Sequence, residues 1–222
     1  MHIRILETGD ASRRGAFYDK IGALRDVGQN HLLETVALLT MERPHTANAE
    51  TIHRLRTEAL EYFSNALPHS IIRGQYRGFV GTAGVGEHSE TETYFKLETK
   101  LKADMWGDVL FTIESGKALH ENVADAVIVF REGQDRHKNV LRIGFSPKPY
   151  VSYDTPITLP KQDTLPDGYE RVLFDCMIGD QTRFVSRTEI LAAWQFVTPI
   201  LEAFNTTPLV IYEPGSSGPV ID

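Results

Sequence analysis

The hydrophobic period of this chain changes near residue 70, and this change limits the folds that the chain can adopt. Before that point, apolar residues recur every three to five positions over 18–42 and again over 49–66, as in amphipathic helices. After it, residues 91–103 alternate between apolar and charged side chains, which is typical of an antiparallel sheet with one buried face. The side that we expect to be buried consists of Phe95, Leu97, Thr99 and Leu101.

Further apolar runs predict a series of short strands, at residues 2–7, 71–76, 109–113, 126–131, 139–145 and 171–178. Residues 181–185 would pair with the last of these across Gly179-Asp180, a hairpin turn signal. The capping box Ser186-Arg-Thr-Glu189 predicts the start of a third helix, which Pro199 should kink or end. The segments expected to be loops are 77–90, 146–168 and 213–219.

Helices first, then a run of antiparallel strands, then a helix, is the order of an α+β protein and not of alternating βαβ units. We therefore expect an α+β fold in a single domain over residues 1–222. Its sheet should be large and mostly antiparallel, with the helices packed on one face.

The composition excludes several classes of protein. The 222 residues carry a net charge of −7, which argues against nucleic acid or an anionic membrane as the main partner. A single cysteine, Cys176, excludes an internal disulfide framework and a cysteine-rich metal site. No apolar run approaches the roughly 18 residues that span a bilayer, and the first residues do not form a signal peptide. We expect a cytoplasmic protein without a metal.

Common cofactor and catalytic motifs are absent as well. A dinucleotide site would show Gly-x-Gly-x-x-Gly between a strand and a helix, but the glycines of residues 81–86 have another spacing and predict a surface loop. The chain contains no Walker A sequence and no His-Glu-x-x-His.

A polar cluster, residues 25–31, interrupts the first helix and contains both Asp26 and His31. One interpretation is a solvated helix face. The other is a site, because an imidazole is the natural general base near neutral pH and needs an orienting carboxylate. On an α-helix at roughly 100° per residue, Asp26 and His31 would lie about 140° apart and could not pair directly. They could both reach a ligand lying across the helix, or another segment could orient His31.

The segment that contains this cluster, residues 14–33, resembles the signature of the glucose-6-phosphate dehydrogenase family in its C-terminal domain. The resemblance continues in order along nearly the whole chain, through residues 73–76, 89–94, 106–119, 168–175, 194–199 and 212–219. It implies the oxidation of glucose 6-phosphate to the phosphogluconolactone, with transfer of a hydride to NADP.

The resemblance also assigns roles to four residues. His31 falls where the family has the general base that removes the proton from the C1 hydroxyl of the sugar. Asp26 and Glu7 fall at carboxylates that contact the sugar, and Lys117 falls at a lysine that binds the substrate. Without the resemblance, Glu7 and Lys117 would be interpreted as ordinary surface charges.

The chain departs from the family pattern in several places. It shows no counterpart of the coenzyme domain, nor of the segment of the type Arg-Ile-Asp-His-Tyr-Leu-Gly-Lys that supplies the carboxylate orienting the base. Glu114 stands where the family usually has arginine, and Asn122 stands where some members have a second basic contact to the substrate. Residues 146–168 form a shorter segment than usual.

These observations leave three hypotheses. The chain is the substrate-binding and dimerisation part of such a dehydrogenase and needs a separate coenzyme-binding chain, or it is a non-catalytic truncated paralogue used for dimerisation or regulation. The least favoured hypothesis is a complete catalyst, because nothing in the chain would hold the nicotinamide. In the first two cases we expect a homodimer through the sheet, or a hetero-assembly, since surface that a coenzyme domain would cover promotes association.

Overall fold

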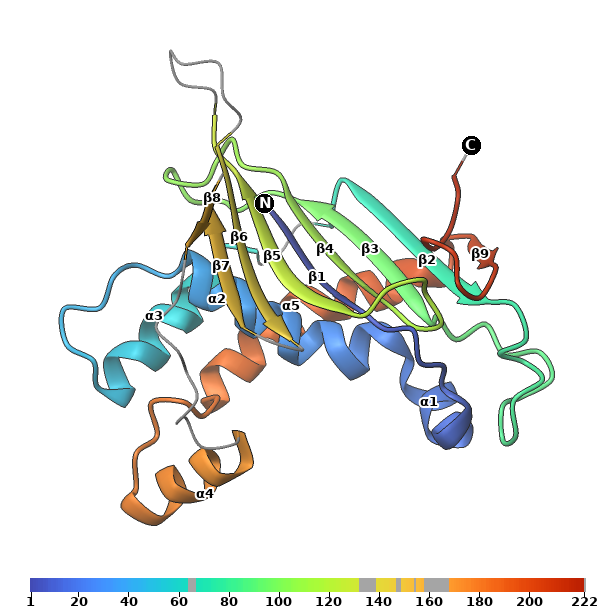
Figure 1. Cartoon of the computed structure of the whole chain (residues 1–222), viewed down its shortest axis with the longest axis horizontal. Helices are drawn as coiled ribbons and strands as arrows, with labels where there is room; N and C mark the ends of the chain where they lie inside the picture. Colours follow the sequence, from blue (N-terminus) through green and yellow to red (C-terminus); the bar gives the residue numbers. More distant parts are fainter. Residues whose placement is uncertain (64–66, 132–138, 147–148, 154, 158–167, 222) are drawn as a thin grey trace.

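The computed structural model describes residues 1–63, 67–131, 139–146, 149–153, 155–157 and 168–221. Within these ranges nine strands form one sheet, in the order β8-β7-β6-β5-β1-β4-β3-β2-β9 (Figure 1). Neighbouring strands are antiparallel except in the pairs β1/β4 and β2/β9, which are parallel. The strands are β1 (His2–Leu6), β2 (Ser70–Tyr76), β3 (Tyr94–Thr99), β4 (Phe111–Gly116), β5 (Val123–Val129), β6 (Val140–Ser146), β7 (Tyr150–Tyr153), β8 (Thr155–Ile157) and β9 (Leu209–Tyr212).

The long helices lie on one face of this sheet, which confirms the α+β class (Figure 1). They are α1 (Gly15–Ala23), the π-helix η2 (Leu24–Leu32), α2 (Leu33–Thr40), α3 (Ala49–Glu61) and α5 (Arg187–Phe204); a short 3₁₀ turn η1 (Ser12–Arg14) and a separate helix α4 (Gly168–Ile178) complete the set. Within the described ranges, no helix has both the length and the apolar character needed to cross a membrane.

The hydrophobic core fills the space between the sheet and these helices. Ile3, Phe95 and Ile113 project from the central strands and are at most 1 % exposed. Leu24, Leu32, Val36, Val197 and Ile200 cover them from the helices. Each such side chain contributes roughly 1.5–3 kcal/mol relative to an exposed position. The apolar side of the alternating segment, which begins at Phe95, therefore faces the helices as its period predicts.

The first predicted helix, 18–42, is divided into three parts. Gly22 has φ 75° and ψ 169°, which is open to glycine but not to other residues, and the helical axis breaks there. The nine residues Leu24–Leu32 form a π-helix, in which the hydrogen bonds join residues i and i+5. Gly22 thus marks a break in the predicted helix.

The prediction of strands at 171–178 and 181–185 is wrong. Residues Gly168–Ile178 form the helix α4, and residues 181–185 form turns. The apolar residues Tyr169, Val172, Leu173, Cys176 and Met177 recur at three- and four-residue intervals, which is a helical period. Gly179 has φ 75° and ends the helix, and the N–H of Asp180 donates to the carbonyl of Asp175 at 3.0 Å. A helix terminus was therefore mistaken for a hairpin turn.

Other boundaries differ less. The segment 146–168, expected to be a loop, contains β7 and β8, while its residues 147–148, 154 and 158–167 lie outside the described ranges. The strand β9 was not predicted, because four residues are too short a run to show a period. The capping box at Ser186 is confirmed, but the helix runs through Pro199 to Phe204. Its last turns are held by buried Ile200 and Phe204 against the core.

A buried charged cluster joins the helices. Arg56 of α3 lies 3.1 Å from a carboxylate oxygen of Glu189, on α5, and donates to the carbonyl of Phe184 at 2.6 Å. Glu34 of α2 lies 3.9 Å from the same guanidinium. Burial raises the pKa of Glu34, and the neighbouring Glu189 adds to this effect. The cluster therefore contains one more carboxylate than cation.

Candidate functional site

The parallel pairing of β1 with β4 brings together two of the residues that the sequence singled out. Leu6 is paired with Gly116, so the next residues, Glu7 and Lys117, leave the sheet at the same end. The N–H of Glu7 donates to the carbonyl of Gly116 at 2.9 Å, and the ammonium of Lys117 forms an ion pair with the Glu7 carboxylate. The register of two strands more than a hundred residues apart thus creates this contact.

Lys117 is buried, so its interpretation as an ordinary surface charge is wrong. Its side chain is 8 % exposed, whereas that of Glu7 is 42 % exposed. The backbone of Lys117 is fixed on both sides, since its N–H donates to the carbonyl of Thr93 and its carbonyl accepts from the hydroxyl of Tyr212. The next residue, Ala118, has φ 53°, a strained value for alanine, and such strain persists where the surroundings hold the chain firmly.

Tyr18 of α1 lies beneath this ion pair. The Lys117 ammonium is 5.4 Å from the centroid of the Tyr18 ring, within the range of a cation–π contact. The Tyr18 side chain is completely buried, and its hydroxyl has no hydrogen-bond partner among the described residues. Burial, together with the nearby carboxylates of Glu92 and Asp26, raises the pKa of Tyr18. The hydroxyl is therefore neutral at physiological pH.

Asp26, on η2, is linked to the same ring through Arg14. The guanidinium of Arg14 donates to an Asp26 carboxylate oxygen at 2.9 Å and lies 6.0 Å from the centroid of the Tyr18 ring. The Arg14 side chain is half exposed, whereas that of Asp26 is 15 % exposed. Tyr18 therefore has two cations near it, each paired with a carboxylate.

His31 lies on the same π-helix as Asp26, and this corrects the expected geometry. In a helix whose hydrogen bonds join residues five apart, such as the bond from the Leu33 N–H to the Gly28 carbonyl, residues 26 and 31 follow one another along one side. The separation of about 140° applies only to an α-helix. His31 is exposed, and its imidazole has no hydrogen-bond partner within the described part of the chain.

The two positions at which the chain departs from the family pattern have structural partners. Glu114 lies on the face of the sheet that the helices do not cover. One of its carboxylate oxygens accepts a hydrogen bond of 2.7 Å from the Tyr94 hydroxyl, and the other lies 2.7 Å from the imidazole Nε2 of His2. Asn122 bonds to both the N–H and the hydroxyl of Thr8. Asn122 thus holds the loop that follows Glu7.

Sequence reasoning missed two residues of this arrangement, Arg14 and Tyr18. Both belong to the segment that carries the resemblance, but no role was assigned to them. They lie four residues apart in the sequence, Arg14 at the N-cap of α1 and Tyr18 within it. Their place in the segment of the family resemblance was the available signal, although nothing in the sequence shows that Tyr18 meets Lys117.

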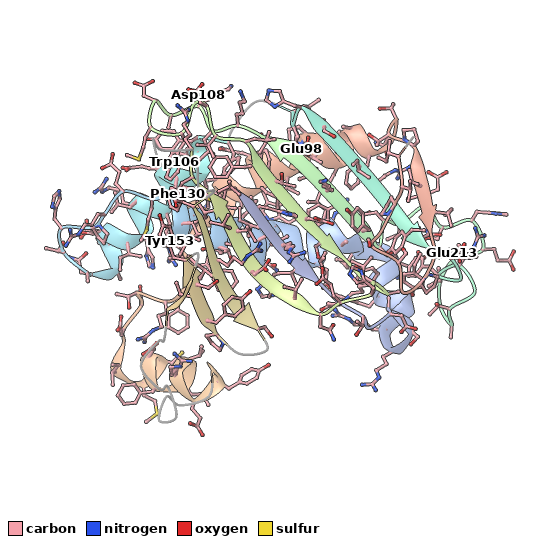
Figure 2. All side chains as sticks on the ribbon, turned by 45° about the horizontal axis from the view of Figure 1, so that its top comes forward. Glu98, Trp106, Asp108, Phe130, Tyr153 and Glu213 are labelled. Atoms are coloured by element: carbon pink, nitrogen blue, oxygen red, sulfur yellow. The ribbon has the colours of Figure 1, made fainter. Side chains whose placement is uncertain are left out.

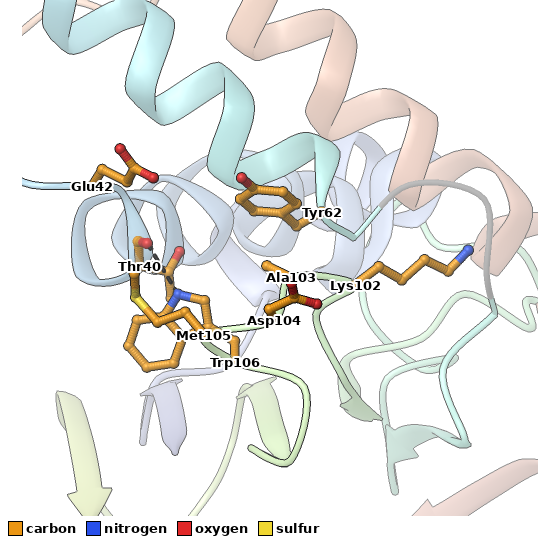
Figure 3. Close-up of a pocket in the computed structure, with 8 residues that line it drawn as sticks. All are labelled: Thr40, Glu42, Tyr62, Lys102, Ala103, Asp104, Met105 and Trp106. Atoms are coloured by element: carbon orange, nitrogen blue, oxygen red, sulfur yellow. Dashed lines mark hydrogen bonds between the residues drawn. The ribbon is translucent and has the colours of Figure 1, made fainter.

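A separate pocket of about 410 Å³ lies between the end of α2, the end of α3 and the loop after β3 (Figure 3). Tyr62, Lys102 and Trp106 are among its lining residues, and the Trp106 indole donates to the Thr40 carbonyl at 3.2 Å. The pocket includes none of the four residues that the resemblance singled out. It is a different feature from the cluster around Tyr18.

The cluster of Glu7, Arg14, Asp26 and Lys117 on Tyr18 suits a particular class of ligand. Carboxylates accept hydrogen bonds from hydroxyl groups, and an ammonium or guanidinium binds anionic oxygens. His31 adds an imidazole, a side chain that serves as a general base in enzymes. The set is thus suited to a small, anionic, hydroxyl-rich molecule. Within the described ranges, no group of three or more His, Cys, Asp or Glu side chains could hold a metal ion.

Residues 1–221 match the family described as “Glucose-6-phosphate dehydrogenase, C-terminal domain”. The glucose-6-phosphate 1-dehydrogenase 1 of Mycobacterium tuberculosis (strain CDC 1551 / Oshkosh) is 33% identical over 242 residues, covering 99% of this chain and 52% of the relative. The enzyme of Chlamydia pneumoniae is 30% identical over 263 residues, covering 99% of this chain and 51% of its own length. The chain thus spans about half the length of these curated relatives.

Solved structures agree with this result. A glucose-6-phosphate 1-dehydrogenase from Mycobacterium avium has a TM-score of 0.84 and 31% identity, over 98% of this chain and 52% of that one. A glucose-6-phosphate dehydrogenase in complex with its substrate glucose-6-phosphate has a TM-score of 0.84 and 25% identity, with the same coverage. By family, sequence and fold, this chain belongs to the C-terminal domains of glucose-6-phosphate dehydrogenase.

Proposed function

We propose that this chain forms the substrate-binding part of a glucose-6-phosphate dehydrogenase, with the site at the end of β1 and β4. The observation that supports this most is the Lys117 ammonium, which is buried and yet paired with the partly exposed Glu7. A buried cation of this kind is costly to desolvate, and a protein retains it most readily where a ligand uses it. A relative of the same fold has been solved with glucose-6-phosphate bound.

In this proposal each residue has a role that follows from its chemistry. Lys117 donates to an oxygen of the sugar phosphate, and Glu7 and Asp26 accept hydrogen bonds from sugar hydroxyls. His31 removes the proton of the C1 hydroxyl as the hydride leaves C1 for the coenzyme, the role of a general base that imidazoles most often fill. Arg14 releases Asp26, in whole or in part, when the sugar binds.

The coenzyme requires groups that the described residues do not supply. No strand in the described ranges leads through a Gly-x-Gly-x-x-Gly turn into a helix, so these residues do not fit a dinucleotide. We therefore propose that NADP, the acceptor that the family resemblance implies, is bound mainly by protein outside this chain. Turnover would then depend on that protein, whereas binding of the sugar phosphate would not.

Calorimetric titration of the purified chain with glucose 6-phosphate, without coenzyme, tests this proposal. We expect saturable binding that becomes about tenfold to a hundredfold weaker in Lys117→Ala and Asp26→Ala, because each loses a charged hydrogen bond. Lys100→Ala, which removes an exposed lysine just after the end of β3, is the control and should bind normally. Absence of binding by the wild-type chain would contradict the proposal and favour the second function.

The second function is that of a dimerisation or regulatory module without catalysis. Apolar side chains are exposed along β5 to β7, among them Val129 at 57% and Phe130 at 45%. Phe130 packs edge to face against Tyr153 at one end of these strands (Figure 2). Such exposed apolar surface favours self-association through the sheet. Self-association is compatible with both the substrate-binding function and the non-catalytic one. A stable monomer at micromolar concentration in analytical ultracentrifugation would contradict self-association.

A cytoplasmic location is part of the same proposal. A relative from Solanum tuberosum, 28% identical over 234 residues, is named a cytoplasmic isoform. Fluorescence microscopy of the tagged full-length protein in its own host would test this location directly.

A further inference from the structure

The break between α1 and η2 leaves two backbone donors that the helix cannot satisfy. At Gly22 the chain turns out of the helical conformation, so the N–H groups of Ala23 and Leu24 begin a new helix without acceptors from the preceding turn. Both donors are satisfied by one residue from another part of the chain. The Ala23 N–H donates to the carbonyl of Glu92 at 3.0 Å, and the Leu24 N–H donates to its side-chain Oε1 at 3.0 Å.

Glu92 fits this break closely. It lies just before β3, and its carboxylate is buried, with the residue 4 % exposed. A Cβ added to Gly22 would collide with Glu92 Oε1, so no larger residue can stand opposite Glu92 in the present geometry. A carboxylate at a helix N-terminus also interacts favourably with the helix dipole. Glu92 therefore caps the N-terminus of η2 from another segment, 68 residues away from Leu24 in the sequence.

The next residue connects the same segment to the other half of the site. The carbonyl of Thr93 accepts the N–H of Lys117 at 3.0 Å, and the N–H of Thr93 donates to the carbonyl of Gly74 at 2.8 Å. Residues 92 and 93 thus touch both the helix that carries Asp26 and His31 and the backbone of Lys117. The strand β2, through Gly74, supports them from the side.

We propose that Glu92 is a positioning residue: by capping η2 at the Gly22 break, it fixes Asp26 and His31 relative to Lys117. This inference rests on the proposed function for its consequence, but the positioning itself is a property of the fold. Glu92 does not touch the ligand in this proposal. It acts through the Leu24 N–H and the start of the π-helix.

Three substitutions of Glu92 test separately its hydrogen bond to the Leu24 N–H, its charge and the length of its side chain. Glu92→Gln keeps an oxygen at Oε1 that can accept from Leu24 but removes the charge. Glu92→Asp keeps the carboxylate on a side chain that is shorter by one methylene group. Glu92→Ala removes both. A matched control is Glu189→Ala, since Glu189 is also fully buried and accepts from a backbone N–H, that of Ser186, at the start of α5.

The first measurement is hydrogen exchange of the η2 amides together with the NMR signals of the His31 ring, which His31→Gln would identify. In Glu92→Ala and Glu92→Asp, we expect exchange at Leu24 and in the following turn to become about tenfold faster and the His31 signals to shift. Glu92→Gln should behave like the wild type. Glu189→Ala should lower the melting temperature without either change in η2.

The second measurement is titration with glucose 6-phosphate. We expect binding about tenfold weaker in Glu92→Asp and Glu92→Ala, and within about twofold of wild type in Glu92→Gln and Glu189→Ala. The inference is overturned if Glu92→Asp exchanges and binds as the wild type does, or if Glu189→Ala weakens binding equally. If the wild-type chain binds no sugar phosphate, the proposed function fails, and the exchange experiment still decides the role of Glu92.

Discussion

The ammonium of Lys117 lies 5.4 Å from the centroid of the Tyr18 ring, and the tyrosine hydroxyl has no partner among the described residues. The ring of Tyr18 therefore contacts the cation, whereas the hydroxyl forms no hydrogen bond with a described residue. The same ring lies 6.0 Å from the guanidinium of Arg14. Substitutions of Tyr18 can therefore remove the hydroxyl alone or the whole aromatic ring, and so separate their contributions.

Replacing Tyr18 tests that distinction. Tyr18→Phe should bind glucose 6-phosphate like the wild type and be equally or slightly more stable, because it removes a buried hydroxyl without a partner. Tyr18→Leu removes the ring, so binding should weaken and stability should fall by about 2–4 kcal/mol. The measurements are urea denaturation and calorimetry. Phe79→Leu, which alters the ring packed edge to face on Tyr18 at 6.1 Å, is the control and should lose stability but not binding.

Glu114 provides a test of pH dependence. Burial alone would raise its pKa, but hydrogen bonds from His2 and Tyr94 outweigh burial and hold the pKa of Glu114 below its ordinary value of 4.5. A carboxyl whose pKa is lowered by folding stabilises the protein above its unfolded pKa and loses that contribution as pH falls through the folded pKa. We expect Glu114→Gln to be about 1–3 kcal/mol less stable at pH 6, with a smaller difference at pH 3. Urea denaturation at both pH values measures this, and a difference that grows on acidification would contradict it.

The charged cluster of Arg56, Glu34 and Glu189 should respond in the opposite direction. Burial, reinforced by Glu189, raises the pKa of Glu34, so folding is penalised above its folded pKa and the penalty disappears as pH falls toward 4.5. Arg56→Leu leaves two buried carboxylates without their cation and should cost about 3–5 kcal/mol at pH 7. The loss should be smaller at pH 5, where Glu34 takes up a proton more readily.

Chemical denaturation at pH 7 and pH 5 checks the Arg56 variant, and Arg54→Leu serves as its control. Arg54 forms an exposed pair with Glu58 on the same helix, so its replacement should change stability little at either pH. A loss in Arg56→Leu that does not depend on pH would show that packing, and not the excess negative charge, dominates at this position.

Gly179 tests the end of α4. Its φ of 75° favours glycine, and a Cβ there would meet no atom within 4 Å, so conformational strain is the only expected cost of alanine. Gly179→Ala should lower the free energy of unfolding by about 1 kcal/mol. Gly168→Ala, at the start of the same helix and equally open, should be neutral or slightly stabilising. Thermal denaturation compares the two, and equal effects would contradict a helix terminus at Gly179.

Local patterns in the sequence were sufficient for much of the fold. The alternation around Phe95 predicted a strand with one buried face, and the capping box at Ser186 predicted the start of α5. Both depend on residues within a few positions of one another, which is why they can be recognised without coordinates. The family resemblance also rests on short motifs in a fixed order along the chain, and the match of residues 1–221 to that family confirms it.

Local patterns failed in two situations. In one, the same pattern fits both a helix and a strand; in the other, the local structure depends on a segment that is remote in the sequence. Residues 168–178 have a helical period that was mistaken for a strand beside a turn. The π-helix could not be foreseen, because its start depends on Glu92, which approaches Gly22 from a distant part of the chain. Its hydrogen-bonding pattern places Asp26 and His31 along one side of the helix, and not about 140° apart as expected for an α-helix.

The sequence by itself, through the family resemblance, determined that Glu7, Asp26, His31 and Lys117 are candidate site residues and on which segments they lie. Only the tertiary structure decided that Lys117 is buried, that Glu7 meets it, and that Tyr18 supports them. The physical reason is that these contacts depend on the parallel register of β1 and β4, in which Leu6 lies beside Gly116. Such a register is set by the packing of the whole sheet, and no periodicity within either strand contains it.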